Sequence, residues 1–249
     1  MSRSIHRLLN RTLSARLRDG LRRMAVATIP SMRHLDMRAR LHNMYECGFS
    51  PRLIVDVGAG RGDWARMAAS VWKDAKIIGF EPNVSDRGAL ELTRRHLPQF
   101  EYHSAFLGPT RQTVAYEQAG HQTSLCVPPT ESFQGATAEM FAFDEWIASR
   151  NVSAPNLIKI DVQGYELEVL KGAEQTLTTC SAVLLETNFI RFAARVSTID
   201  ETIQFMHEHG FAWYDSMGIL RRRRDDVLSQ MDVMFVRRGH DLRTDPSCW

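Results

Sequence analysis

Short apolar strands alternate with helices through the middle of the chain, and this order constrains the fold more than any other feature. Strands are predicted over 53–57, 77–80 and 100–106, with helices over 64–72 and 85–96 between them. Parallel strands need such helical crossovers, so the pattern predicts an α/β fold with helices on both faces of a mostly parallel sheet. Ligands of these sheets bind beyond the carboxyl ends of the strands. Functional residues are therefore expected directly after each strand.

The second half of the chain continues the pattern. A fourth strand ends at Asp161, and Gly164 leads into one helix whose apolar face carries Leu167, Leu170 and Ala173. The basic run 221–224 is expected in a solvated loop. Further strands are predicted over 181–186, 211–215 and 231–236, and an extra hairpin that covers the site is predicted over 112–127.

Composition sets the class of protein. A chain of 249 residues with 44% apolar and 24% charged residues suits one globular domain with a small appendage. The four cysteines are far apart, which argues against a zinc site or a disulfide framework and favours the cytoplasm. The net charge of +2 gives no support to a nucleic-acid partner. No apolar run approaches the roughly 18–20 residues that span a bilayer, and no secretory signal is visible.

The N-terminal segment is distinctly basic. Residues 3–24 carry seven arginines against a single acid, Asp19, and large apolar residues recur at every fourth position from Ile5 to Leu21. This pattern predicts an amphipathic helix. The helix could dock on the main domain or lie on an anionic membrane surface, and a mitochondrial presequence would look similar. A second helix is predicted over 32–47, which gives a helical extension (1–48), a main domain (49–240) and a tail (241–249).

A glycine loop with Gly58, Gly60 and Gly62 follows the first strand. Such a loop lets a ligand approach the backbone, and the helix after it offers free N–H groups. Asp56 would repel a pyrophosphate at this point but suits the ammonium and sulfonium of S-adenosylmethionine. Asp63 also stands where a dinucleotide site has its third glycine. The loop therefore favours S-adenosylmethionine over NAD.

Glu81 and Pro82 follow the second strand. An acid in this place can accept hydrogen bonds from both ribose hydroxyls of an adenosyl ligand. A dehydrogenase would use the same acid, so Glu81 does not choose between the two cofactors. The alternative is a solvated acid on the surface.

The stretch 156–173 carries the most specific signal. It includes KIDVQGYELEVLKGA and resembles the FkbM family of methyltransferases. IVDVGAGRGDW, GFEPN, AFLG, FDEWI, VLLET and MDVMFVRR match that family in order, over roughly residues 50–240. The resemblance implies a class I methyltransferase (Rossmann-like) fold of seven strands, the last inserted antiparallel. It also places Ala105, within AFLG, in the cofactor site. Many relatives carry Glu at the position of Gln163.

Two acids are candidate catalytic groups. A hydroxyl nucleophile must lose its proton as it attacks, so a carboxylate beyond a strand end can act as a base. Asp161 has the best position and is also a predicted cofactor contact, and Glu186 follows the fifth strand with Asn188 close by. The pair could instead hold Mg²⁺, although we assign no residue as a metal ligand. His103 and His121 are secondary candidates, because a lone histidine is more often a packing or surface residue.

These observations favour an S-adenosylmethionine-dependent methyltransferase. The resemblance implies an oxygen acceptor on a sugar, a polyketide or another natural product. The alternatives are an NAD-dependent oxidoreductase on a related sheet and a non-catalytic S-adenosylmethionine-binding protein. The sequence leaves the oligomeric state open.

Overall fold

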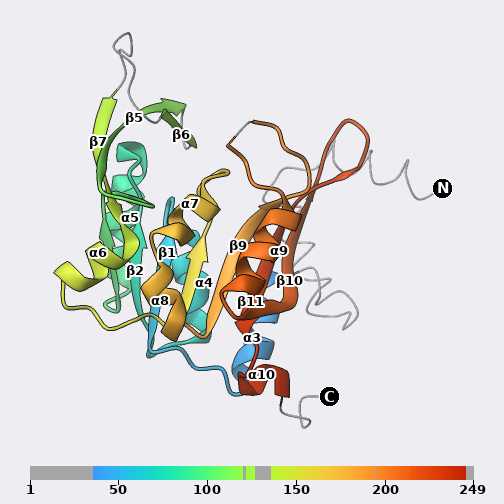
Figure 1. Ribbon diagram of the computed structural model, residues 1–249. Coiled ribbons are helices and arrows are strands. Elements are labelled where there is room, and N and C mark those ends of the chain that lie inside the picture. The colour runs from blue at the N-terminus through green and yellow to red at the C-terminus, as the bar shows by residue number, and fades with distance from the viewer. Residues whose placement is uncertain (1–35, 120–121, 127–135, 194, 245–249) are drawn as a thin grey trace, which may run out of the picture.

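A seven-stranded mixed sheet forms the centre of the molecule (Figure 1). The computed structural model describes residues 36–119, 122–126, 136–193 and 195–244. The strand order is β10-β11-β9-β8-β1-β2-β3, and only β11 runs antiparallel to its neighbours. This confirms the predicted mostly parallel sheet with its last strand inserted antiparallel. Its members are β1 (Leu53–Val57), β2 (Lys76–Phe80), β3 (Phe100–His103), β8 (Leu157–Ile160), β9 (Ala182–Asn188), β10 (Phe211–Arg221) and β11 (Leu228–Arg237).

Helices cover both faces of this sheet, as predicted. On one face Val55 and Val57 pack with α6 (Phe143–Ser149), α7 (Glu166–Lys171), α8 (Glu174–Thr179) and α9 (Ile199–Glu208). On the other face Ile54 packs with α3 (Met37–Glu46), α4 (Asp63–Val71) and α5 (Arg87–His96), which follows the short 3-10 helix η2 (Val84–Asp86). Successive side chains of a strand point to opposite faces, so β1 contributes to both cores.

A second, smaller sheet has the order β4-β7-β5-β6. Its strands are β4 (Phe106–Gly108), β5 (Gln112–Ala119), β6 (Gln122–Cys126) and β7 (Ala136–Ala142). The antiparallel pair β5 and β6 confirms the predicted hairpin. The single strand predicted over 100–106 is wrong, because β3 ends at His103 and Phe106 already belongs to the second sheet. The strand β7 had not been predicted.

Two further boundaries differ from the sequence prediction. The single helix expected after Gly164 is divided into α7 and α8 at Gly172. A Cβ at Gly172 would lie 1.9 Å from the carbonyl oxygen of Gly108, so this turn packs directly on β4. Strand β10 extends to Arg221, well beyond the predicted end at Asp215, and irregularities in its pairing with β11 account for its weak sequence pattern.

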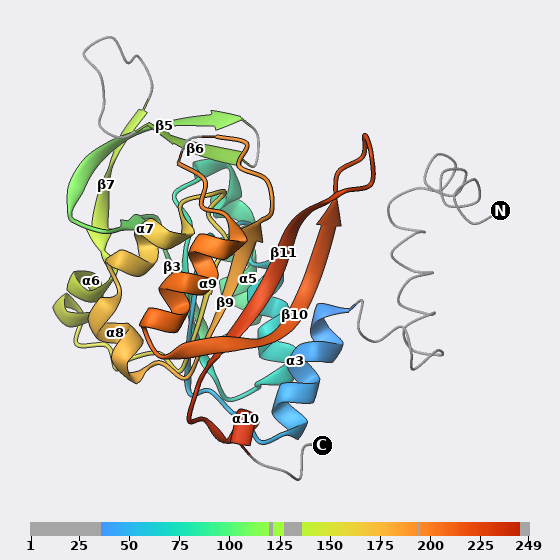
Figure 2. The ribbon, with the colours of Figure 1, turned by 45° about the vertical axis from the view of Figure 1, so that its right-hand side comes forward.

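The chain ends of the described part pack against the main sheet (Figure 2). Leu41 and Met44 of α3 are buried, and Leu242 of α10 (Asp241–Thr244) belongs to the same core. Asp36 caps α3 by accepting a hydrogen bond from the Arg38 N–H at 2.9 Å. The basic helix predicted over 3–24 lies outside the described residues. Within the described ranges, no helix has the length and apolar character that crossing a bilayer requires.

Candidate cofactor and acceptor site

A cavity lies at the carboxyl ends of β1, β2 and β8, where a ligand site was expected. Six predicted site residues line it: Gly58, Gly60, Glu81, Pro82, Ala105 and Asp161. Three others, Asp56, Gly62 and Glu186, are not among its lining residues. The remaining lining residues are Val57, Phe80, Phe106, Leu107, Val162, Gln163, Tyr165 and Arg195.

The glycine loop after β1 lies close to the neighbouring strand β8. Gly58 has a positive φ of 76°, and a Cβ there would lie 1.9 Å from the backbone oxygen of Asp161. Its N–H donates to the carbonyl of Phe80 at 2.9 Å. Only glycine permits this approach, so Gly58 is needed for the loop geometry as well as for an open cavity wall. Gly62 starts α4 at a φ of 77° and faces Thr93 instead of the cavity.

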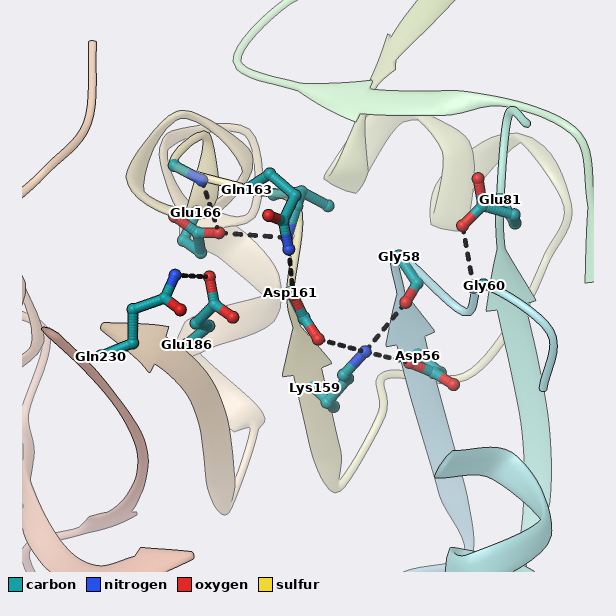
Figure 3. A network of polar contacts seen from close by, with 12 residues as sticks. Asp56, Gly58, Gly60, Glu81, Lys159, Asp161, Gln163, Glu166, Glu186 and Gln230 are labelled. Atoms are coloured by element: carbon teal, nitrogen blue, oxygen red, sulfur yellow. Dashed lines mark hydrogen bonds and ion pairs between the residues drawn. The ribbon is translucent and has the colours of Figure 1, made fainter. Parts of the chain in front are cut away.

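Glu81 is held firmly at the cavity wall. Its Oε2 accepts the Gly60 N–H (Figure 3) and its Oε1 accepts the Asn83 N–H, both at 2.8 Å. Burial raises the pKa of Glu81, and these two hydrogen bonds oppose the rise. Each carboxylate oxygen keeps a further lone pair for a ligand hydroxyl. The side chain is therefore fixed before any ribose is bound.

A buried cation, Lys159, joins the glycine loop to two carboxylates. Its Nζ lies 2.9 Å from the Gly58 carbonyl oxygen, 3.1 Å from Asp56 Oδ1 and 3.6 Å from Asp161 Oδ2 (Figure 3). Burial lowers the pKa of Lys159, but Asp56 and Asp161 outweigh it and hold that pKa above its ordinary value. Lys159 was not among the residues predicted from the sequence. The signal was present, because a lysine inside a buried apolar strand requires an acidic partner.

Asp56 pairs with Lys159 and does not line the cavity. Its side chain is fully buried, and β1 and β8 place Asp56 directly beside Lys159 in register. Burial raises the pKa of Asp56, and Lys159 opposes the rise. The predicted contact with a ligand ammonium is therefore replaced by an indirect role, in which Asp56 balances the charge that holds the glycine loop.

Asp161 is the second acid that lines the cavity, after Glu81. About a third of its side chain is exposed, at 36%. Gln163 lines the same wall and donates from Nε2 to Asp161 Oδ1 at 3.2 Å. Buried Glu166 accepts the N–H groups of Val162 and Gly164, both at 3.0 Å, and so fixes the turn that carries Gln163. Lys159, the Gln163 amide and the turn that Glu166 fixes together orient the Asp161 carboxylate.

Glu186 lies among other acids beside this site. Its Oε1 accepts a hydrogen bond from Gln230 at 2.9 Å. Burial and repulsion from Asp161, Glu166 and Asp232 raise the pKa of Glu186 to about 8, and burial and Asp161 raise that of Asp232 to about 6. Glu186 is therefore largely protonated at neutral pH, and since it does not line the cavity, Asp161 has the better position for a base. Within the described residues, no group of three or more acids, histidines and cysteines could hold a metal ion.

His103, one of the two histidine candidates, does not contribute to this cavity. His103 packs edge-on against Trp146, with ring centroids 4.7 Å apart, and burial lowers its pKa. It is not among the lining residues. His121 lies outside the described residues.

A mixed sheet of this strand order, with a glycine loop and two strand-end acids around one cavity, defines a Rossmann-like class I methyltransferase fold. The model of the methyltransferase FkbM domain matches residues 56–212. The chain belongs to the FkbM methyltransferase family. For this family, S-adenosylmethionine is the implied methyl donor.

Individual proteins are similar to this chain only over a short segment or at low sequence identity. The hexuronic acid methyltransferase AglP of Haloferax volcanii is 42% identical over 50 residues, which is 20% of this chain and 21% of that protein. The structure of an FkbM methyltransferase from Methylobacillus flagellatus KT is similar at a TM-score of 0.48 and 17% identity, over 74% of this chain and 43% of that one. Magnesium protoporphyrin IX methyltransferase of Synechocystis PCC 6803, with bound SAM, has a TM-score of 0.48 at 11% identity, over 89% and 81% of the chains.

Proposed function

We propose that this protein is an S-adenosylmethionine-dependent O-methyltransferase that acts on a hydroxyl of a sugar. The observation that supports this proposal is that the glycine loop, Glu81 and Asp161 line one and the same cavity. When bound, S-adenosylmethionine supplies an electrophilic methyl group on a sulfonium. The protein's own residues must bind this donor, orient the acceptor and take up the acceptor's proton.

The cavity wall suits the parts of the donor. Glu81 can accept hydrogen bonds from the two ribose hydroxyls, because both of its oxygens are already positioned by backbone N–H groups. Ala105, Phe106 and Leu107 supply an apolar wall for a planar base. Gly60 leaves open space beside it, since a Cβ there would meet nothing within 4 Å. These residues fit an adenosyl group.

Asp161 is the residue we assign as general base. Its Oδ1 accepts from Gln163 and its Oδ2 faces Lys159, so the carboxylate has a fixed direction. A positioned base that accepts the hydroxyl proton during attack contributes about 10²–10⁴-fold to rate. Alignment of the nucleophile with the methyl group adds a further, larger effect.

A sugar is the acceptor class we favour. The curated relative is named for hexuronic acid, and the cavity adds polar groups beyond the donor wall. Gln163, Tyr165 and Arg195 line this part, and they can hydrogen-bond to several hydroxyls or to a carboxylate. The rival NAD-dependent oxidoreductase would need a pyrophosphate at the loop where Asp63 replaces the third dinucleotide glycine.

Substitution of Asp161 tests the base directly. With S-adenosylmethionine and a panel of glycosides and uronic acids, Asp161→Asn should lower kcat by about 100-fold or more, with donor affinity changed far less. The exposed acid Asp74, replaced as Asp74→Asn, is the matched control and should leave both values unchanged.

Four outcomes of this test differ in meaning. Loss of turnover with donor binding intact supports the base. An equal loss of turnover and of donor affinity assigns Asp161 to donor binding, as a group that orients the methionine part of S-adenosylmethionine. Full turnover in Asp161→Asn contradicts the assignment. Absence of methyl transfer to every acceptor, with donor binding retained, would favour the non-catalytic alternative.

A further inference from the structure

The hairpin that joins β10 and β11 carries exposed aliphatic side chains. Ile219 and Leu220 at the end of β10 are 52% and 55% exposed, and Val227 before β11 is 45% exposed. We call residues 219–227 the hairpin tip. Figure 2 shows this hairpin projecting from the body of the molecule. A solvated turn gains nothing from three large apolar side chains in water, so the hairpin tip is poorly explained as a plain connection.

The hairpin tip is also strongly basic. It carries four arginines, Arg221 to Arg224, against Asp225 and Asp226. Arg222 pairs with Asp225, with Nη2 2.6 Å from Oδ2, and Arg221 donates to the backbone oxygen of Asp226 at 2.8 Å. In the part of the chain that the structure describes, no ion pair involves Arg223 or Arg224. Their charges are therefore available to an anionic partner.

A second exposed apolar pair lies beside the same hairpin. Phe189 and Phe192, in the loop after β9, are 37% and 63% exposed. The Phe189 N–H donates to the backbone oxygen of Ser229 at 2.9 Å, which fixes this loop to the start of β11. The loop therefore carries exposed aromatic rings next to the base of the same hairpin.

This surface lies at the edge of the sheet where the cavity opens. β10 runs parallel to β9, because each is antiparallel to β11 between them, so the hairpin tip and the carboxyl end of β9 lie at one edge. Arg195, from the same loop as Phe192, lines the cavity itself. A partner seated on the hairpin tip therefore meets the molecule on its ligand-binding side.

We propose that the hairpin tip, with Phe189 and Phe192, docks the protein on an anionic phospholipid surface. Such a surface offers two kinds of contact. Aliphatic and aromatic side chains can enter the headgroup region, and arginines beside them can pair with the lipid phosphates. A nucleic acid would match the arginines but would leave Ile219, Leu220 and Val227 without a role. If the proposed function holds, docking also brings the cavity to acceptors held at the membrane; the docking itself does not depend on it.

Vesicle sedimentation of the full chain tests this proposal. Wild-type protein should bind phosphatidylcholine vesicles that contain phosphatidylglycerol, and bind pure phosphatidylcholine vesicles far less. Two variants separate the contacts: I219S/L220S/V227S removes the apolar side chains, and R223Q/R224Q removes two charges. Each should weaken binding to anionic vesicles by about tenfold or more. Unchanged thermal unfolding shows that the variants are folded.

Matched controls place similar changes elsewhere. Y45S/L92S removes exposed apolar side chains of α3 and α5, and R94Q/R95Q removes exposed charges of α5; both should bind like wild type. R16Q/R18Q/R22Q/R23Q tests the basic N-terminal segment in the same assay. The proposal would be overturned if both hairpin-tip variants bound anionic vesicles as strongly as wild type. It would also be overturned if the wild-type protein did not bind anionic vesicles. Retained binding in the N-terminal variant supports it.

Discussion

At the residue scale, Glu81 shows how a ligand contact can be prepared in advance. Both of its oxygens are already hydrogen-bonded to backbone N–H groups, so ribose binding needs little reordering of the side chain. Glu81→Ala should weaken binding of S-adenosylmethionine by about 1.5–3 kcal/mol, the usual value of hydrogen bonds to a charged acceptor. Titration calorimetry measures the change, with the exposed acid Glu174, replaced as Glu174→Ala, as the control. An unchanged dissociation constant would remove Glu81 from the ribose site.

The raised pKa of Glu186 leads us to expect that stability depends on pH. Its pKa is about 8 in the folded protein against 4.5 when unperturbed, so the unfolded chain releases this proton first as pH rises. The free energy of unfolding should therefore fall between about pH 4.5 and 8, by at most about 1.4 kcal/mol per pH unit for this proton. Asp232 adds a fall between 3.8 and about 6.

Urea unfolding across this pH range checks the expectation. Glu186→Gln should flatten the decline above about pH 6, where Asp232 no longer contributes, because the amide cannot ionise. The exposed residue Glu208, changed as Glu208→Gln, should keep the wild-type slope. An equal slope in wild type and Glu186→Gln would mean that the folded protein does not hold this proton.

Some residues of the site could be predicted from the sequence, and others could not. Gly58, Glu81 and Asp161 were predictable, because strand ends of a parallel sheet converge and each of these residues follows a strand. The role of Asp56 was not, since it depends on Lys159, a residue 103 positions later that the strand register places beside it. A pairing between distant strands is settled by tertiary register, which one strand alone does not encode.

At the element scale, α3 joins the N-terminal part to the main sheet. Leu41 is fully buried in the core that α3 shares with α4, and Arg40 pairs with Asp215 of β10 at 2.8 Å. Leu41→Ala should lower the free energy of unfolding by about 2–5 kcal/mol through lost burial and a residual cavity. Tyr45 on the same helix is 45% exposed, so Tyr45→Ala should change it by no more than about 0.5 kcal/mol.

The same measurement bears on the predicted boundary at residue 48. Chemical denaturation should show one transition that moves as a whole in Leu41→Ala. If residues 37–48 instead form a separate extension, the main transition would stay in place and only a minor one would shift. We propose that α3 is part of the main folding unit, since its buried face has no other partner in the described chain than this core.

Elements buried on both faces were the easiest to predict. β1, β2, β8 and β9 appear in the sequence as apolar, β-branched runs, because helices cover both sides of the sheet. β7 was missed because most of its side chains are exposed or only partly buried. The break between α7 and α8 was missed for a different reason, since it follows from contact with Gly108, far away in the chain.

At the scale of the whole molecule, the cavity is built from both sheets. Phe106 and Leu107 of β4 face the same space as Gly58 and Asp161 from the ends of β1 and β8. A ligand in the cavity therefore contacts both layers, and its binding energy adds to the stability of the folded state. The order of strands and helices predicted the main sheet and a hairpin over the site, whereas the division into two sheets, with Phe106 and Leu107 on β4, came only from the three-dimensional arrangement.

Ligand-induced stabilisation consequently distinguishes the candidate cofactors. S-adenosylhomocysteine, the demethylated donor, at about 100 times its dissociation constant should add about 2.7 kcal/mol to the free energy of unfolding. For a protein of this size that corresponds to a rise in Tm of about 5–10 °C. NAD at the same concentration should leave Tm unchanged, because a carboxylate occupies the place of the third dinucleotide glycine at the loop. The Glu81→Ala variant should show a smaller rise with S-adenosylhomocysteine than wild type. A rise with NAD alone would instead assign the cavity to an oxidoreductase.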